Sequence, residues 1–350
     1  MLVTLITGAN GWLGTQLIDA LVNGLPEIPL LSKPDTNRQV RCLVIPGSDT
    51  EKLKRLSSKI EIFEGDLRNI NTLQEFCRDI KGATLFNCAG IIHPEKSIKE
   101  LYSVNVEGTK NILTLAEKNG ARRAIIMSSN SPIGISKEPS NIFNESSPYN
   151  PYMNYGRSKM QMEKIVHSFQ ERGKLETVIV RAPWFYGPGQ PPRQSLFFKM
   201  VKQGKAPILG DGNNLRSMSY LGNLAQGLIL CEKVHDANGK TYWISDEKPY
   251  TTNQIVDTIE NLLENEFNIS VTHKRFKLPY LVGEIATCMD YSIQSIGLYH
   301  QKIHVLSEMN KNIACSVEKA KDELGYKPIV CLEEGMRRSI DWCLKNGQNI

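Results

Sequence analysis

The first residues of the chain combine an apolar run, a glycine-rich turn and an amphipathic segment, and this combination restricts the fold more than any other feature. Residues 2–7 are rich in β-branched side chains, which predicts a buried strand. Gly8, Gly11 and Gly14 follow, and leucines then recur at helical spacing. Glycine lets the backbone approach a phosphate closely, and the N-terminus of the next helix stabilises its charge. The chain is therefore expected to open with a strand, a phosphate-binding turn and a helix.

The first half of the chain continues to alternate between strands and helices. Further strands are predicted at residues 40–45, 60–63, 85–88, 124–127 and 177–180. A long helix is predicted over residues 98–118. This alternation predicts an α/β fold with a Rossmann-type, doubly wound parallel sheet, and ligands should gather at the carboxyl ends of its strands.

The pattern loosens from about residue 184, where loops rich in proline and glycine alternate with short helices. One later strand, at residues 241–245, is expected to return to the sheet. We therefore predict a dinucleotide-binding domain and a smaller, mainly helical C-terminal substrate lobe. The first comprises residues 1–183 with 216–247, and the second comprises 184–215 with 248–350.

Composition excludes several classes of protein. The net charge is +5 and the basic residues are dispersed, so we expect no nucleic-acid partner. The most apolar late stretch, residues 278–298, contains Glu284 and Asp290, so we expect no membrane partner. The eight cysteines form no C-x-x-C pair, as in reduced proteins of the cytosol. The first predicted strand begins almost at Met1, which leaves no room for a signal peptide, and a cytoplasmic location is expected.

A pentapeptide on a predicted helix, Tyr155-Gly156-Arg157-Ser158-Lys159, carries the strongest chemical signal. Tyr155 and Lys159 are four residues apart, so both side chains lie on one helical face. A cation beside a phenol favours the phenolate and lowers its pKa, which suits proton transfer near neutral pH. The same spacing also occurs in solvated helix pairs, and the order of the surrounding motifs decides between the two interpretations.

Taken together, these motifs resemble the extended short-chain dehydrogenase/reductase family, the group that contains nucleotide-sugar epimerases and dehydratases. The resemblance covers nearly the whole chain. It extends to Leu209-Gly210-Asp211-Gly212 and to Leu324-Gly325-Tyr326-Lys327-Pro328, which are typical of the family's substrate lobe. It implies a Rossmann-type enzyme that uses NAD or NADP.

The resemblance also implies where the cofactor binds. The glycine turn would hold the pyrophosphate, Asp66 and Leu67 would lie at the adenine, and Pro183 would lie near the nicotinamide amide. Asn105 is expected to stabilise a helix bend beside the site more than to do chemistry. The complete set of cofactor-binding residues is Gly8, Asn10, Gly11, Trp12, Leu13, Gly14, Asp66, Leu67, Cys88, Ala89, Gly90, Asn105, Tyr155, Lys159 and Pro183.

The catalytic residues implied by the resemblance are Ser129, Tyr155 and Lys159. Tyr155 would exchange a proton with the reacting hydroxyl while hydride passes to or from the nicotinamide. Ser129 would hydrogen-bond the same oxygen, and Lys159 would hold the ribose hydroxyls and lower the tyrosine pKa. Ser128 and Ser131 are close rivals for the serine role.

The end of the second predicted strand gives no decisive cofactor signal. Neither an acidic residue for NAD nor an arginine for NADP stands there, and Ile45 occupies the position where NADP-using relatives often have arginine. Lys52, Lys54 and Arg55 follow, but they also fit a solvated face. NAD is preferred over NADP on this evidence.

The substrate signals conflict. Arg216 matches an arginine that nucleotide-sugar epimerases use on the substrate pyrophosphate, and it makes a nucleotide sugar the first hypothesis, for either an epimerase or a one-way oxidoreductase. The segment Tyr220-Leu221-Gly222-Asn223 instead resembles 3β-hydroxysteroid dehydrogenases, and Trp184 replaces an asparagine that contacts substrate in UDP-galactose 4-epimerase. The alternative is therefore a dehydrogenase or reductase of an apolar alcohol or ketone. A non-catalytic dinucleotide-binding regulator is a third hypothesis, which the intact serine, tyrosine and lysine set disfavours.

Three further expectations concern metals, assembly and one insertion. His300 and His304 are four residues apart but lack the H-E-x-x-H context, so we expect surface histidines and no metal site. A homodimer is expected from the family pattern, through the 98–118 helix and the helix that bears Tyr155. The proline-rich connection over 24–36 is assigned no function.

Overall fold

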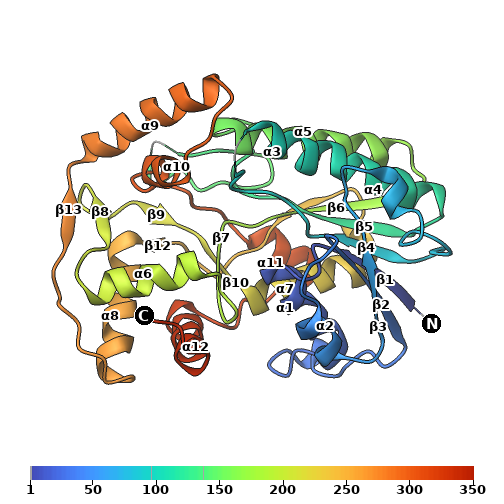
Figure 1. Ribbon diagram of the computed structural model, residues 1–350, viewed down its shortest axis with the longest axis horizontal. Coiled ribbons are helices and arrows are strands. Elements are labelled where there is room, and N and C mark those ends of the chain that lie inside the picture. The colour runs from blue at the N-terminus through green and yellow to red at the C-terminus, as the bar shows by residue number, and fades with distance from the viewer. Residues whose placement is uncertain (1, 96, 137) are drawn as a thin grey trace.

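The computed structural model describes residues 2–95, 97–136 and 138–350, and a seven-stranded parallel sheet forms its centre (Figure 1). The strand order is β11-β6-β5-β4-β1-β2-β3, and every neighbouring pair is parallel. The strands are β1 (Leu2–Thr7), β2 (Arg38–Val44), β3 (Ile60–Glu64), β4 (Thr84–Asn87), β5 (Arg123–Met127), β6 (Glu176–Arg181) and β11 (Thr241–Trp243). This confirms the predicted doubly wound sheet, including the late strand that returns to its edge.

Helices cover both faces of this sheet and enclose two hydrophobic cores. Successive residues of a strand face opposite cores, as Leu5 and Ile6 of β1 do. On one face lie α1 (Trp12–Asn23), α7 (Leu221–Lys233) and α11 (Glu318–Leu324), and on the other lie α4 (Thr109–Lys118) and α5 (Met153–Glu171). Shorter helices in the connections are η1 (Pro29–Leu31), α2 (Glu51–Leu56), η2 (Ile70–Leu73), α3 (Lys99–Tyr102) and η4 (His235–Ala237).

The predicted helix over 98–118 is not uniform. A π-helical stretch, η3 (Ser103–Gly108), separates α3 from α4 and contains Asn105. The extra residue per turn bends the helix at the carboxyl edge of the sheet, where such irregularities often mark a functional site.

The remaining chain is mainly helical and packs around a third core at the other end of the molecule (Figure 1). Its helices are α6 (Pro192–Lys202), α8 (Thr252–Asn265), α9 (Tyr280–Ser295), α10 (Gln301–Glu308) and α12 (Leu332–Lys345). Three small sheets pair β7 (Trp184–Tyr186) with β10 (Met218–Tyr220), β9 (Leu215–Arg216) with β12 (Tyr250–Thr251), and β8 (Pro207–Leu209) with β13 (Phe276–Leu278). In the part of the chain that the structure describes, we find no helix whose length and hydropathy would suit a bilayer crossing.

The connection over residues 24–36 attaches to this helical region. Glu27 forms an ion pair with Arg338 of α12. The insertion therefore links the first βα unit to the C-terminal helix, a contact that the sequence did not indicate.

A buried ion pair fixes α5 against the ends of β5 and β6. Arg181, at the end of β6, donates from Nε to Glu163 Oε1 at 3.1 Å and from Nη2 to Oε2 at 2.7 Å. Ser128 and Tyr149 donate to the same carboxylate at 2.5 and 2.8 Å. Both charged groups are buried, so the carboxylate depends on these donors to replace its hydration.

Replacing Glu163 with alanine should destabilise the fold strongly. The change would leave the Arg181 guanidinium buried without its counter-charge, which typically costs about 3–5 kcal/mol. Urea unfolding should show this loss, while the same replacement at Glu171, which is exposed on the same helix, should have little effect. Equal unfolding midpoints for Glu163→Ala and wild type would show that the pair does not anchor α5.

Candidate active site

The pentapeptide at the start of α5 fits closely against the loop that follows β5. A Cβ atom at Gly156 would lie 2.4 Å from the carbonyl oxygen of Ser131, so only glycine permits this approach. Ser158 donates to the carbonyl oxygen of Tyr155 at 2.8 Å and accepts from Asn105 Nδ2 at 3.1 Å. Sequence reasoning assigned no role to Gly156 or Ser158, yet both position the tyrosine.

Lys159 is buried beside the ends of β4 and β5. Its Nζ donates to the carbonyl oxygen of Met127 at 3.0 Å, and burial lowers its pKa to about 8. An added Cβ at Gly90 would lie 3.3 Å from the same Nζ. A cation thus borders the place where Gly90 was expected to line a cofactor.

Tyr155 lies beside Ser129, as the resemblance implied. Burial raises the pKa of Tyr155 to about 12, and hydrogen bonding to Ser129 opposes that rise. The expected lowering of this pKa by Lys159 is not found in the chain alone, because burial of the phenol dominates and Nζ is engaged by Met127. A bound oxidised nicotinamide would add the positive charge that favours a tyrosinate.

The three candidate serines have different surroundings. Ser128 donates to the buried carboxylate of Glu163 at 2.5 Å, so its hydroxyl proton is already used in a structural hydrogen bond. Ser131 Oγ lies 3.3 Å from Ser129 Oγ, and Ser129 is the serine that hydrogen-bonds to Tyr155. Ser129 is therefore the serine that the geometry favours.

The glycine turn forms a cradle of bare backbone. An added Cβ at Gly14 would lie 2.1 Å from the carbonyl oxygen of Gly8, and one at Gly8, where φ is +64°, would lie 2.9 Å from Ala89 N and Cα. Trp12 Nε1 donates to the carbonyl oxygen of Pro188 at 2.8 Å and ties the turn to the loop after β7. The cradle fits a pyrophosphate, and a recess beside it is lined by Asn10, Thr15, Ser48, Asp49, Lys52 and Leu53.

Other predicted cofactor residues are placed as follows. The Asp66 carboxylate accepts from Arg68 Nε at 2.9 and 3.0 Å, which lowers its pKa, and Leu67 is buried against Gly108. Asn105 is fully buried and exchanges two hydrogen bonds of 2.9 Å with the backbone of Ile91. These bonds tie the π-helical stretch to the loop after β4, and the role expected for Asn105 at a helix bend stays a prediction.

Two residues near the end of β4 and β6 complete the predicted set. Cys88 follows β4, and burial raises the pKa of its thiol to about 12, so it stays uncharged. Pro183 is buried in the link between β6 and β7, next to Trp184. Leu13 is buried in the first turn of α1 and packs in the core.

Arg216 and Trp184 meet on the substrate side. The guanidinium carbon of Arg216 lies 5.9 Å from the centre of the Trp184 ring, and its Nη2 donates to the backbone carbonyl of Glu308. Burial lowers the pKa of Arg216, which still remains charged at any working pH. No carboxylate forms an ion pair with it in the described part of the chain.

Arg193, in the first turn of α6, is a site residue that sequence reasoning missed. Partial burial lowers its pKa, and the phenols of Tyr299 and Tyr155 lie near enough to act on its charge, although the residue is exposed to solvent. Among residues 2–95, 97–136 and 138–350 it has no carboxylate partner. Nothing in the local sequence, Pro191-Pro192-Arg193, marks it, because its proximity to Tyr155 and Tyr299 depends on tertiary packing.

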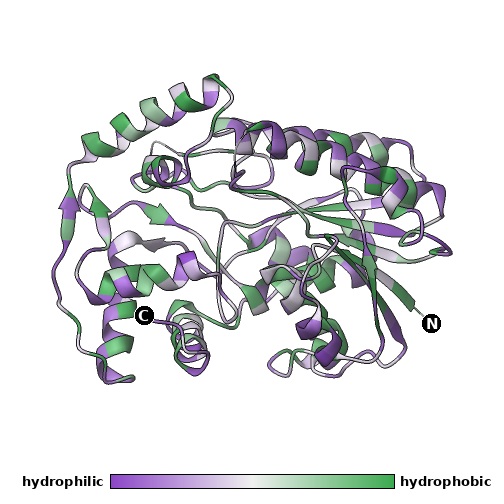
Figure 2. Cartoon of the chain, viewed as in Figure 1, coloured by the Kyte–Doolittle hydropathy of each residue, from purple (hydrophilic) through white to green (hydrophobic). Residues whose placement is uncertain are grey.

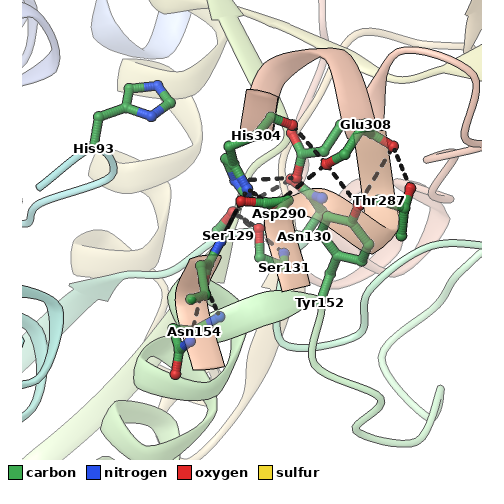
Figure 3. A network of polar contacts seen from close by, with 12 residues as sticks. His93, Ser129, Asn130, Ser131, Tyr152, Asn154, Thr287, Asp290, His304 and Glu308 are labelled. Atoms are coloured by element: carbon green, nitrogen blue, oxygen red, sulfur yellow. Dashed lines mark hydrogen bonds and ion pairs between the residues drawn. The ribbon is translucent and has the colours of Figure 1, made fainter. Parts of the chain in front are cut away.

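A buried polar network joins α9 and α10 to Tyr152 and Asn154 at the start of α5 (Figure 3). His304 Nδ1 lies 2.7 Å from Asp290 Oδ2, and Tyr152 donates to Ser307 Oγ at 2.8 Å. The expectation of a surface histidine is wrong for His304, which is 3% exposed, because its ring packs between two helices. We find no cluster of metal-binding side chains among the described residues.

The segment that resembled 3β-hydroxysteroid dehydrogenases is structural here. Asn223 donates to the carbonyl oxygen of Val330 at 2.8 Å and to Asp246 Oδ1 at 3.2 Å. Tyr186 donates to the other oxygen of Asp246 at 2.6 Å, and burial raises the pKa of this aspartate to about 7. The motif therefore holds the helical region together and does not itself identify a substrate.

Comparison with known proteins gives a consistent assignment. The sequence model of the NAD dependent epimerase/dehydratase family matches residues 4–245. "Uncharacterized protein y4nL" of Sinorhizobium fredii is 49% identical over 99% of this chain and 96% of its own length. Two named enzymes are more distant. The N-acetyl-alpha-D-glucosaminyl-diphospho-ditrans,octacis-undecaprenol 4-epimerase of Escherichia coli O157:H7 is 30% identical (97% of this chain, 94% of that protein). The decarboxylating sterol-4-alpha-carboxylate 3-dehydrogenase of Candida albicans is 28% identical (97% and 96%).

Solved structures share the fold. The UDP-glucuronic acid 4-epimerase of Bacillus cereus in complex with NAD superposes with a TM-score of 0.74 over 99% of both chains, at 20% sequence identity. At this identity the likeness establishes the architecture alone.

Removing the Tyr155 hydroxyl tests the site. Tyr155→Phe should fold and bind NAD normally but lose about 10²–10⁴-fold in turnover, because the group that carries the proton is gone. The exposed Tyr291→Phe serves as a matched control and should keep full activity. Near-normal turnover by Tyr155→Phe would show that another group exchanges the proton.

Proposed function

The chain belongs to the NAD-dependent epimerase/dehydratase family, and from this premise we propose that it oxidises a hydroxyl-bearing carbon of a nucleotide sugar by hydride transfer. The oxidised sugar is then either reduced again by return of the hydride to its opposite face, as in an epimerase, or released, as in a one-way oxidoreductase. In this proposal residues 1–183 with 216–247 hold the cofactor, and residues 184–215 with 248–350 hold the substrate.

The roles of the catalytic residues follow from their positions. Tyr155 accepts the proton of the reacting hydroxyl, and Ser129 hydrogen-bonds the same oxygen and orients it. Lys159 holds the ribose hydroxyls of the cofactor beside Gly90. When bound, NAD supplies the hydride acceptor. The cradle of Gly8, Gly11 and Gly14 gives the pyrophosphate backbone donors and the N-terminus of α1.

The observation that carries the proposal is a pair of arginines without carboxylate partners. Arg216 is half-buried and Arg193 is exposed, both keep their charge, and neither forms an ion pair within the described residues, although the Glu308 carboxylate acts on Arg216 from further away. A guanidinium presents a planar fork of donors that matches phosphate or carboxylate oxygens. An anionic substrate would supply the missing counter-charge, and a nucleotide sugar carries it in its diphosphate.

The alternative is an apolar alcohol or ketone, and one observation favours it. The recess next to Trp184 is largely apolar, with Phe197, Phe198, Met218 and Met336 among its lining residues. The relative from Candida albicans is named for a sterol carboxylate, a substrate that is apolar and anionic at once. Such a substrate would use an arginine and the recess together.

NAD rather than NADP is the proposed cofactor. Asp49 lines the recess beside the glycine turn, where a carboxylate can accept from ribose hydroxyls and would repel a 2′-phosphate. Lys52 lines the same recess and would attract the 2′-phosphate of NADP, so the preference for NAD is expected to be moderate. The cytoplasmic location stays a proposal, supported by the free state of all eight cysteines.

We retain a homodimer through the 98–118 helix and α5 as a prediction from the family pattern. The apolar side chains of α5 do not support it, because Met162, Val166 and Phe169 pack against the sheet inside one chain. Light scattering at micromolar concentration should give twice the mass of one chain, and a monomer mass would refute this assembly.

Substitution of the two arginines separates the substrate classes. If the substrate is a nucleotide sugar, Arg193→Ala and Arg216→Ala should each weaken its binding by at least about 1.5 kcal/mol, the typical contribution of a charged hydrogen bond. NAD affinity should not change, since its pyrophosphate lies on the glycine turn. Arg78→Ala, which removes an exposed arginine, is the control. Calorimetric titration with a panel of nucleotide sugars measures both affinities.

The opposite outcome would redirect the proposal. If no nucleotide sugar binds in the presence of NAD, but a sterol carboxylate does and depends on Arg193, the apolar alternative holds. Binding of an uncharged alcohol with no dependence on either arginine would contradict the argument from unpaired charge.

A further inference from the structure

Apolar exposure on this protein is concentrated in one segment. Of the 17 large apolar side chains that are exposed in the described part of the chain, nine fall within residues 276–305, so the exposure is not scattered. They are Phe276, Tyr280, Leu281, Ile285, Met289, Tyr291, Ile296, Leu298 and Val305. We name this surface the α9 face; α9 runs along the edge of the molecule, and hydrophobic residues recur along it (Figures 1 and 2).

Helix α9 is oriented opposite to an ordinary surface helix. Leu281, Ile285 and Met289 follow one another at four-residue spacing and form an outward stripe. The polar side chains Asp290 and Gln294 are buried instead, against His304 of α10 and Asn154 of α5. The helix thus buries two polar side chains and leaves an apolar stripe exposed, next to the exposed Ser292 and Ser295.

The acidic and basic side chains of residues 276–305 lie in different places. Asp290 is fully buried, and Glu284, whose side chain is 41% exposed, forms an ion pair with Lys311. Lys277 and Lys302 are exposed at the two ends, and neither forms an ion pair in the residues that the structure describes. The outward surface is therefore apolar in the middle and positive at both ends.

We propose that the α9 face lies on the surface of an anionic lipid bilayer, with its apolar side chains in the interfacial layer and its lysines at the headgroups. A helix of 16 residues is about 24 Å long and would lie parallel to the bilayer plane. Tyr280 and Tyr291 suit this layer, because a tyrosine has an apolar body and a polar tip. The expectation of no membrane partner rested on Glu284 and Asp290, of which Asp290 is buried and Glu284 is partly exposed but paired with Lys311.

A second copy of the chain fits this face less well. Antiparallel pairing of two α9 stripes about a two-fold axis would oppose the lysine at one end with the lysine at the other, which places like charges together. Anionic headgroups supply the complementary charge at both ends at once, and each lysine near such a surface contributes favourably.

The α9 face is continuous with the wall of the active site. Tyr299 follows Leu298 directly, hydrogen-bonds to His93, and lies near enough to Arg193 to act on its charge. The Leu298–Tyr299 segment would therefore connect a bilayer-bound α9 face directly to the substrate side of the active site.

Co-sedimentation with lipid vesicles tests the proposal. The full chain should sediment with vesicles of phosphatidylcholine mixed with phosphatidylglycerol, more weakly with phosphatidylcholine alone, and less at high salt. Leu281→Glu combined with Ile285→Glu should lower the bound-to-free ratio by about tenfold or more, since each buried leucine or isoleucine side chain contributes substantially to burial in an apolar phase. Lys277→Glu combined with Lys302→Glu should abolish the preference for phosphatidylglycerol.

Controls make the result specific. Leu344→Glu, at an exposed apolar site on α12, should bind vesicles as wild type does. Melting temperatures of all variants should stay near wild type, because the replaced side chains are exposed. No sedimentation of the wild type with anionic vesicles would overturn the proposal. A wild-type oligomer that Leu281→Glu with Ile285→Glu dissociates, with vesicle binding unchanged, would assign the face to a second copy instead.

Discussion

The buried ion pair between Glu163 and Arg181 is the interaction on which the candidate active site depends. It joins the middle of α5 to the end of β6, and the same carboxylate also accepts from Ser128 and Tyr149. Because three side chains donate four hydrogen bonds to one carboxylate, α5 can neither rotate nor slide without leaving a buried charge unsatisfied. The reactive end of the helix is therefore held at the carboxyl edge of the sheet, where the cofactor cradle also lies.

Positive charge without a protein counter-charge characterises the cleft. Lys159, Arg193 and Arg216 each lack an ion pair among the described residues, although other arginines of this chain, such as Arg38 and Arg123, are paired with carboxylates even when buried. A protein that leaves such charges unpaired is less stable for it, and bound anions offset that loss. The proposed cofactor and the proposed substrate both carry a diphosphate, so the two ligands would supply the missing charge from opposite sides.

The sequence predicted the features that repeat or that depend on local geometry. The seven strands of the central sheet were predicted to within two residues because buried strands have a continuous apolar pattern, whereas the six short strands of the smaller sheets were not predicted. The glycine turn and the Tyr155 pentapeptide were found because spacing alone places their groups. Arg193 and the burial of His304 were missed, because each depends on contacts between elements that are distant in the sequence, and no local pattern records such contacts. The burial of Asp290 in α9 was missed for the same reason: composition does not tell which way a side chain faces.

We propose that hydride leaves a carbon of the substrate for NAD bound at the glycine turn. The most direct test mixes the enzyme and NAD with nucleotide sugars whose ring carbons carry deuterium or hydrogen, and follows the absorbance of reduced nicotinamide. We predict that reduced nicotinamide forms during a single turnover and that deuterium slows its formation by a primary isotope effect. Turnover of the sugar without any reduced nicotinamide, or at equal rates for both isotopes under single-turnover conditions, would contradict the claim.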